Sequence, residues 1–293
     1  MAKQMVIISG KGGTGKTVIS AAFCAIAKNK VIVDADVDAA DLFLLLNPVT
    51  QETHGFSGGY KAIINGDFCT QCGACYNHCH FEAINKNYII DDILCEGCGF
   101  CAKICPNNAI KMQPADSGEW YISETKYGTF VHAKLGIAEE NSGKMVSLIK
   151  YKATEIANKN KCEWIIIDGP PGIGCSVIAC LSNADIALIV TEPTLSGLED
   201  AKRVVEVAKH FGVQVNLVIN KYDLNEKMTG IIEQYCVAQC IPLIGKIKFD
   251  RAVVDSVVNG KNIMELSYIN AEEIKRMINE VWENLTKNLL IEG

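Results

Sequence analysis

The sequence has no apolar run long enough to cross a bilayer and no excess of positive charge. Its longest apolar runs, such as Trp164–Ile167 and Ile186–Val190, are far shorter than the roughly 20 residues that a membrane-spanning helix needs. Its 28 lysines and arginines are outnumbered by 34 aspartates and glutamates, which gives a formal net charge of −6. Because binding to a nucleic-acid backbone requires a basic surface, we expect no nucleic-acid partner and no membrane span.

The start of the chain also lacks the pattern of a secretory signal. Met1 leads directly into the apolar stretch Met5–Ile8 and a glycine-rich loop, without the charged, apolar and small-residue zones of a signal peptide. We therefore expect a cytoplasmic protein. In that compartment its 14 cysteines favour metal ligation or redox chemistry over disulfides.

Length and composition indicate a globular protein of about two domains. The chain has 293 residues, of which 49% are hydrophobic and 21% charged, as is usual for soluble globular proteins. Strands are expected at Gln4–Ser9, Lys30–Asp34, Trp164–Asp168, Ile186–Thr191, Gln214–Asn220 and Leu243–Lys248, and helices at Thr17–Lys28, Ala39–Leu46, Ser142–Lys159 and Ser196–Phe211. Near-continuous apolar strands alternating with helices predict an α/β fold with a parallel sheet covered by helices, whose ligands collect at the strands' carboxyl ends.

A phosphate-binding loop follows the first predicted strand. The residues Gly10, Lys11, Gly12, Gly13, Thr14, Gly15, Lys16 and Thr17 fit the pattern G-x-x-x-x-G-K-[ST] between a strand and a helix. The glycines let backbone N–H groups surround phosphate oxygens, Lys16 neutralises the terminal phosphates, and Thr17 can ligate Mg²⁺. The alternative is a glycine-rich turn without a ligand. The pattern predicts binding of a nucleotide with Mg²⁺.

The loop carries an additional lysine, Lys11, directly after its first glycine. In this form it resembles the deviant Walker A loop of the MinD, Mrp and nitrogenase iron protein ATPases. The resemblance implies ATP hydrolysis by a homodimer in which Lys11 reaches the nucleotide of the partner subunit. A solvated loop lysine is the alternative.

Two aspartates stand at the ends of predicted strands, where ligands of such a sheet collect. By the same resemblance, Asp36 orients or deprotonates the attacking water, and Asp168 is the Walker B carboxylate near Mg²⁺. Asp38 is either a further switch residue or a helix cap, and capping is the alternative for Asp36 and Asp168 too. The resemblance also implies that Asn220 reads the adenine base; otherwise it is a loop asparagine in a turn.

Eight of the cysteines form two runs with the spacing of bacterial ferredoxins. The first run is Cys69, Cys72, Cys75 and Cys79, and the second is Cys95, Cys98, Cys101 and Cys105. In this spacing three cysteines of each run bind one [4Fe–4S] cluster and the fourth binds the other. One cluster is therefore predicted on Cys69, Cys72, Cys75 and Cys105, and the other on Cys79, Cys95, Cys98 and Cys101. Zinc is the alternative, but paired C-x2-C knuckles explain only half of each run.

The repeat extends past the cysteines, because an Ala-Ile pair follows both runs in register. His80 stands where the second run has Pro106, and we expect His80 and His78 not to be ligands. Most other cysteines are expected to be buried apolar residues. By resemblance to the nitrogenase iron protein, which places a cluster ligand at the same offset from its Walker B aspartate, Cys175 is a candidate ligand bridging two subunits. Cys236 with Cys240 is a candidate metal or redox pair.

Taken together, the motifs resemble MinD-superfamily ATPases with an inserted ferredoxin domain. The predicted ATPase domain covers residues 1–59 and 114–293, and the predicted ferredoxin domain residues 60–113. The leading hypothesis is ATP-driven conformational change that gates electron transfer from two [4Fe–4S] clusters to an unknown redox protein partner. An iron–sulfur or metal-centre maturation factor of the Mrp type is the alternative.

Spatial positioning of the MinD kind is a third hypothesis, and it requires a basic amphipathic tail for membrane attachment. The tail from Asn270 to Gly293 has only three cationic side chains, Lys275, Arg276 and Lys287, among several glutamates. Membrane attachment is therefore not expected.

Overall fold

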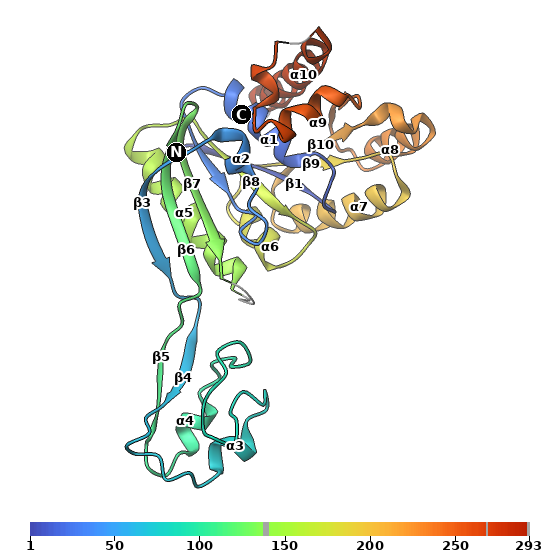
Figure 1. The fold of residues 1–293 in the computed structure, drawn as a ribbon. Helices are drawn as coiled ribbons and strands as arrows, with labels where there is room; N and C mark the ends of the chain where they lie inside the picture. The colour runs from blue at the N-terminus through green and yellow to red at the C-terminus, as the bar shows by residue number, and fades with distance from the viewer. Residues whose placement is uncertain (137–140, 268, 292–293) are drawn as a thin grey trace. The chain divides into compact units, whose positions relative to one another are not determined.

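The computed structural model describes residues 1–136, 141–267 and 269–291. The chain divides into two compact units. Unit 1 consists of Met1–Thr53, Trp120–Lys134 and Ser142–Gly293, and unit 2 of His54–Glu119 and Leu135–Asn141. Unit 2 contains the whole of the predicted insert. The two units are described separately (Figure 1).

Unit 1 is built on a sheet of nine strands in the order β11-β10-β9-β1-β8-β2-β7-β6-β3. Its strands are β1 (Lys3–Ser9), β2 (Lys30–Asp34), β3 (Val49–Phe56), β6 (Gly118–Thr125), β7 (Gly128–Leu135), β8 (Trp164–Pro171), β9 (Ile186–Thr191), β10 (Gln214–Asn220) and β11 (Leu243–Ile247). Each neighbouring pair from β11 to β7 is parallel. In this part of the sheet the predicted strands and their parallel arrangement are confirmed.

The prediction of a wholly parallel sheet is wrong, because the sheet is mixed. Strands β6 and β7 are neighbours joined by only two residues, Lys126 and Tyr127, and so short a connection makes them an antiparallel hairpin. The edge strand β3 was missed too. All of its residues except His54 and Phe56 are exposed, and its sequence is largely polar. It therefore lacks the apolar run by which the buried strands were recognised.

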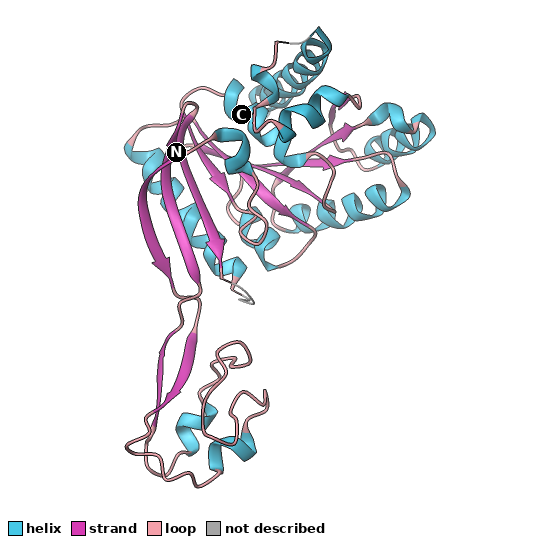
Figure 2. Ribbon diagram, in the orientation of Figure 1, coloured by secondary structure: helices cyan, strands magenta, loops and turns pink. Residues whose placement is uncertain are grey.

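The helices of unit 1 follow the predicted alternation. They are α1 (Lys16–Ile26), α2 (Leu42–Leu46), α5 (Ser142–Lys159), α6 (Cys175–Leu181), α7 (Leu195–His210), α8 (Glu226–Ala238), α9 (Arg251–Val258) and α10 (Ile269–Ile291), with short 3-10 turns at Tyr222–Leu224 and Ile263–Glu265. The bounds of α5 are those predicted, and α7 is displaced by one residue at each end. Figure 2 shows these helices packed around the magenta strands.

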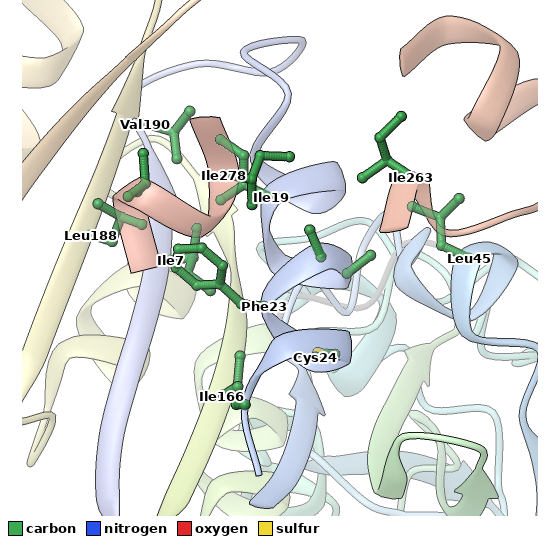
Figure 3. Packing of buried hydrophobic residues seen from close by; sticks show 14 of the residues in the cluster. Ile7, Ile19, Phe23, Cys24, Leu45, Ile166, Leu188, Val190, Ile263 and Ile278 are labelled. Carbon is green, nitrogen blue, oxygen red and sulfur yellow. The ribbon is translucent and has the colours of Figure 1, made fainter. Parts of the chain in front are cut away.

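The sheet is buried on both faces, as its unbroken apolar strands require. In β1, Met5 and Ile7 join the core cluster that contains α1 and α10, while Val6 and Ile8 are equally buried. Because side chains alternate along a strand, Val6 and Ile8 point to the opposite face. Figure 3 shows Ile7 close to Phe23 of α1 in the first of these layers. The two layers hold the strand ends, and therefore the loops that follow them, in fixed positions.

Helix α10 carries most of the tail for which membrane attachment is not expected; residues 292–293 lie outside the described part. It buries Ala271, Ile274, Ile278, Val281 and Leu285, at the spacing of one helix face, and it contacts β11 and α1. Its apolar face is thus used inside unit 1. Of the helices in the described residues, none combines the length and hydrophobicity needed to cross a membrane.

Unit 2 is a small two-fold repeat. It contains the antiparallel pair β4 (Tyr60–Ile64) and β5 (Ile110–Pro114) and the short helices α3 (Ala74–His78) and α4 (Phe100–Ile104). The two helices begin and end 26 residues apart, the offset of the cysteine runs. Among the residues of this unit that the structure describes, the core cluster has six buried members: Ala62, Cys75, Ala83, Ile84, Cys95 and Ile110.

Candidate functional site

The phosphate loop joins β1 to α1 at the carboxyl end of β1. Gly15 adopts φ 89°, a left-handed conformation that side chains disfavour, and it directly precedes α1. A Cβ atom at Gly15 would lie 2.3 Å from Nδ2 of Asn220. This position therefore requires glycine both for its backbone conformation and for its neighbour.

Lys16 lies inside the site, with only 7% of its side chain exposed. Its Nζ is 3.0 Å from Oδ1 of Asp168 and 3.8 Å from Oδ2 of Asp36. Burial lowers the pKa of Lys16, but the carboxylates of Asp168, Asp36 and Asp34 outweigh it and raise that pKa above its ordinary value. The predicted residues Lys16, Asp36 and Asp168 are thus brought together, and Lys16 is held charged where phosphates are expected.

The aspartates around Lys16 are held by hydrogen bonds and by burial. The hydroxyl of Ser20 donates to Asp168 at 2.6 Å, and Asp34 accepts the backbone N–H groups of Asp36 and Leu42, each at 3.2 Å. Burial, and next the Asp168 carboxylate, raises the pKa of Asp34 well above its ordinary value. Burial also raises the pKa of Asp36 to about 6, and Lys16 only partly offsets this effect.

We predict that Asp36→Asn stabilises the protein at neutral pH in the absence of added nucleotide. Because the folded-state pKa of Asp36 is raised from 3.8 to about 6, the folded chain binds more protons than the unfolded chain between these values, and stability falls as pH rises through them. At about pH 7 the variant should exceed the wild type by on the order of 2 kcal/mol, allowing for partial exposure of the side chain. At about pH 4 the two should be equal.

Urea unfolding at both pH values measures this difference. Asp38→Asn is the matched control, because Asp38 is exposed and lies two residues away. Equal stability of wild type and Asp36→Asn at neutral pH would show that the Asp36 carboxylate costs nothing to ionise in the folded protein.

A cavity with room of about 440 Å³ opens beside the phosphate loop. Gly12–Val18 line one side of it, and Asp36, Leu44 and Val257 are among the residues on the other. The Oγ1 atom of Thr14 is buried there and has no hydrogen-bond partner among the described residues. A buried hydroxyl without a partner is costly, and a phosphate oxygen would supply the missing acceptor. The donors present therefore fit a nucleotide phosphate, with Thr17 and Asp168 as candidate Mg²⁺ ligands.

Lys11 does not face this cavity. Its Nζ is 2.7 Å from Oε1 of Glu192 and donates to the hydroxyls of Thr194 and Ser196, at 3.3 and 3.0 Å. The other oxygen of Glu192 pairs with Lys221 at 3.2 Å. Lys11 is therefore bound within its own chain, and its predicted reach to a partner subunit would require these contacts to break.

Asn220 supports the phosphate loop from the end of β10. Its Nδ2 donates to the carbonyl of Thr14 at 2.7 Å, and its Oδ1 accepts the backbone N–H of Lys221. Lys221 in turn donates to the carbonyl of Gly13 at 2.8 Å. Both ends of the Asn220 amide are thus used within the chain, and recognition of adenine by this residue stays a prediction.

The functional residues that sequence reasoning missed are those that support the loop and its carboxylate. They are Ser20, Asp34, Glu192 and Lys221. Glu192 and Lys221 follow the strands β9 and β10, so their place at the carboxyl edge of the sheet was a usable signal. No motif marked Ser20, which lies one helical turn beyond Lys16.

In unit 2 the eight cysteines line two separate cavities, four to each. The cavity that we call the closed site is lined by Cys69, Cys72, Cys75 and Cys105, and the one that we call the open site by Cys79, Cys95, Cys98 and Cys101. These are the two ligand sets expected from the ferredoxin spacing. At the closed site the backbone N–H of Ala109 donates to Sγ of Cys105 at 3.2 Å.

Among the described residues, no group of three or more histidines, cysteines, aspartates or glutamates is placed to hold a metal ion. A single zinc ion needs its sulfur ligands about 2.3 Å from one point, whereas an iron–sulfur cluster occupies the space between them. The open site, with room of about 240 Å³ between its four cysteines, fits the second case. The closed site leaves only about 10 Å³ and would have to widen to hold a cluster. His78 and His80 line the open site, and His78 Nδ1 lies 2.9 Å from the carbonyl of Ala74.

The six other cysteines are divided between core and surface, and every cysteine in the chain is free. Cys24, Cys180 and Cys236 are buried, as expected of small apolar side chains. Cys175 and Cys240 are exposed. Cys236 is buried whereas Cys240 is exposed, and their pairing stays a prediction.

Fold and site define a P-loop protein that binds and hydrolyses nucleotides. Residues 5–263 match the family model of the CobQ/CobB/MinD/ParA nucleotide binding domain, and the chain belongs to this family. An uncharacterized protein of Methanocaldococcus jannaschii is 39% identical over 76% of this chain and 79% of its own length. The septum site-determining protein MinD of Synechocystis is 27% identical over 90% of this chain and 82% of its own length.

Solved structures agree with the fold. The septum site-determining protein MinD of Pyrococcus horikoshii, complexed with Mg-ADP, superposes with a TM-score of 0.61 at 18% identity. The match covers 100% of this chain and 99% of that one. The cell division ATPase MinD of Pyrococcus furiosus gives a TM-score of 0.55 at 19% identity, over 97% and 99% of the two chains.

Proposed function

We propose that this MinD/ParA-family ATPase carries two [4Fe–4S] clusters in unit 2 and couples ATP hydrolysis to electron transfer with a redox partner protein. The observation that carries the proposal is the division of eight cysteines into two cavities of four. Each cavity takes three cysteines from one run and one from the other, which is the exchange that two-cluster ferredoxins require.

The small core of unit 2 supports this proposal independently. A core cluster of six buried residues is small for a unit of this length, and domains of this size usually need disulfides or metals to be stable. All its cysteines are free, so disulfides do not fill that role. Cysteine-bound clusters would hold the loops together, and they would supply reversible one-electron storage.

In unit 1, the chain's own residues account for the hydrolytic half of the function. Lys16 and the loop N–H groups would neutralise the phosphates, and Asp36 would accept a hydrogen bond from the attacking water. Above about pH 6 the Asp36 carboxyl is ionised and able to do so. A nucleotide-bridged homodimer would require Lys11 to exchange Glu192 for a phosphate of the partner subunit. These roles, and a cytoplasmic location, are part of the proposal.

Iron and acid-labile sulfide content, measured after anaerobic purification, tests the cluster half of the proposal. We expect about eight irons and eight sulfides per chain, because each set of four cysteines binds one [4Fe–4S] cluster. A paramagnetic resonance signal should appear on reduction with dithionite. A chain that contains zinc and no labile sulfide would overturn the assignment.

A further inference from the structure

We infer that the two cysteine sites have different roles: the open site exchanges electrons with the partner protein, which docks there through a basic surface with an apolar centre. This inference rests on the proposed function and adds to it the site of exchange and the chemistry of the partner. The two halves of unit 2 repeat at an offset of 26 residues, so each residue of one half has an equivalent in the other.

The backbone repeats closely between the two halves. Asn65 N donates to Ala109 O and Asp91 N to Ala83 O, both at 2.7 Å, so that each half closes the same way. Positive φ angles also recur in register, at Gln71 and Gly97, at Gly73 and Gly99, and at Glu82 and Asn108. Differences between the sites therefore arise from side chains and not from the path of the chain.

Two side-chain hydrogen bonds close the first site. Nδ2 of Asn107 donates to the hydroxyl of Thr70 at 2.7 Å, which ties the loop after Cys105 to the loop after Cys69. The hydroxyl of Tyr88 donates to the carbonyl of Gln71 at 2.6 Å. The space left inside is only about 10 Å³, about enough for one water molecule.

The second site cannot be closed in this way. Phe81 stands in register with Asn107 and Glu96 with Thr70. A phenyl ring has no hydrogen-bonding group, so the bond between the loops is lost. The open site has room of about 240 Å³, and two of its lining residues, Phe81 and Phe100, are 37% and 48% exposed. The ligand cysteines of the two sites are similarly exposed, so it is the wider opening with its exposed phenyl rings that favours electron exchange at the open site.

The surface around the open site has a distinct charge. Between residues 82 and 96 the side chains of Glu82, Asp91, Asp92 and Glu96 are exposed, as is that of Lys86, and Glu96 lines the open site. A second lysine, Lys61, donates to the carbonyls of Asp92 and Cys95, so acidic side chains still outnumber basic ones here. Exposed apolar side chains with acidic neighbours fit a partner that presents a small apolar patch ringed by lysines or arginines. The partner is a one-electron carrier, so that one electron passes from the reduced group of one protein to the oxidised group of the other and no bond or proton is exchanged.

Two register-matched cysteine variants separate the sites. Cys98→Ala removes one exposed ligand of the open site, and Cys72→Ala removes its counterpart in the closed site. Stopped-flow oxidation of the reduced full chain by hexaammineruthenium(III), a cationic one-electron oxidant, serves as the probe. In the wild type we expect a fast phase of oxidation from the open site and a slow phase from the closed site. Cys72→Ala should keep the fast phase, and Cys98→Ala should lose it. Loss of the fast phase in Cys72→Ala, or equal slowing in both variants, would overturn the inference.

A pair of charge variants tests the docking surface. At low salt, Glu96→Gln should slow electron exchange with the cationic probe roughly twofold or more, because one attracting charge is lost. Asp67→Asn is the control, since it removes an exposed carboxylate close to Cys69 of the closed site, and its rate should not change. An equal effect of both variants, or an effect that salt does not diminish, would contradict electrostatic docking at the open site.

The wild-type protein provides a test that needs no variant. On exposure to a ferrous chelator, about four irons should leave rapidly and about four slowly. Eight irons leaving in one phase would overturn the inference while leaving the proposed function intact, whereas absence of iron and sulfide after anaerobic purification would refute the proposed function itself. Transfer of the rapidly released iron, together with sulfide, to an apo-ferredoxin would contradict electron exchange at the open site and would indicate that this site delivers its cluster instead.

Discussion

Lys16→Gln is expected to reduce ATP hydrolysis by about 10²- to 10³-fold, the cost typical of removing one preorganised charge that stabilises the transition state. In the wild type, the buried ammonium of Lys16 lies 3.0 Å from the Asp168 carboxylate and faces Asp36 as well. Without it, these carboxylates would repel the phosphates that the loop is built to hold. Nucleotide affinity should fall together with the rate.

The measurement is phosphate release at saturating and at low ATP. Lys28→Gln, at an exposed lysine just beyond the end of α1, is the matched control and should leave the rate unchanged. Iron content should be the same in all three proteins, because the cysteines belong to unit 2. A rate for Lys16→Gln within about twofold of the wild type would show that phosphates bind elsewhere.

Gly15→Ala should weaken nucleotide binding by at least about tenfold and destabilise unit 1. The left-handed conformation of Gly15 costs an alanine about 1–2 kcal/mol, and the added Cβ would lie 2.3 Å from the Asn220 amide. Asn220 would have to move, and its hydrogen bond to the Thr14 carbonyl would be lost. Calorimetric titration with ATP and thermal unfolding measure the two effects.

The double variant Gly15→Ala, Asn220→Ala separates these causes. Removing the amide relieves the collision but not the backbone strain, so part of the lost stability should return, and the coupling between the two substitutions should be measurable. Gly230→Ala in α8 is the control, because a Cβ there meets no atom within 4 Å. Additive effects of the two substitutions would contradict the predicted contact.

Much of unit 1 was predictable because its strands are buried on both faces. Residues such as Trp164–Ile167 form unbroken apolar runs. The phosphate-loop motif predicted that the first strand is followed directly by the first helix. The hairpin of β6 and β7 and the edge strand β3 were not predicted. Their partly exposed faces carry polar residues such as Thr50 and Glu52, which give no apolar signal from which a strand could be recognised.

The convergence of Lys16, Asp36 and Asp168 was predictable from topology, since the carboxyl ends of parallel strands meet at one edge. The contacts of Lys11 were not. Its pairing with Glu192 joins residues 181 positions apart, and it depends on side-chain directions that strand order does not specify. The same holds for the amide of Asn220, which supports the loop from the end of β10.

In unit 2 the spacing of the cysteines predicted which four would share a cavity. It did not predict that the cavities differ, because the difference comes from residues between the ligands. Asn107 and Phe81 occupy equivalent positions and have opposite effects on closure of their sites. Such differences in side-chain bonding and exposure are among the factors that set cluster properties in iron–sulfur proteins.

The central claim, that nucleotide chemistry and electron transfer are coupled in one chain, is tested most directly by one measurement. ATP hydrolysis is followed in the anaerobically purified full chain, with its iron content verified, once with the clusters oxidised and once after reduction. Coupling of about 1 kcal/mol or more predicts rates that differ by about fivefold or more. Identical rates, with about eight irons present in both states, would contradict coupling within this chain.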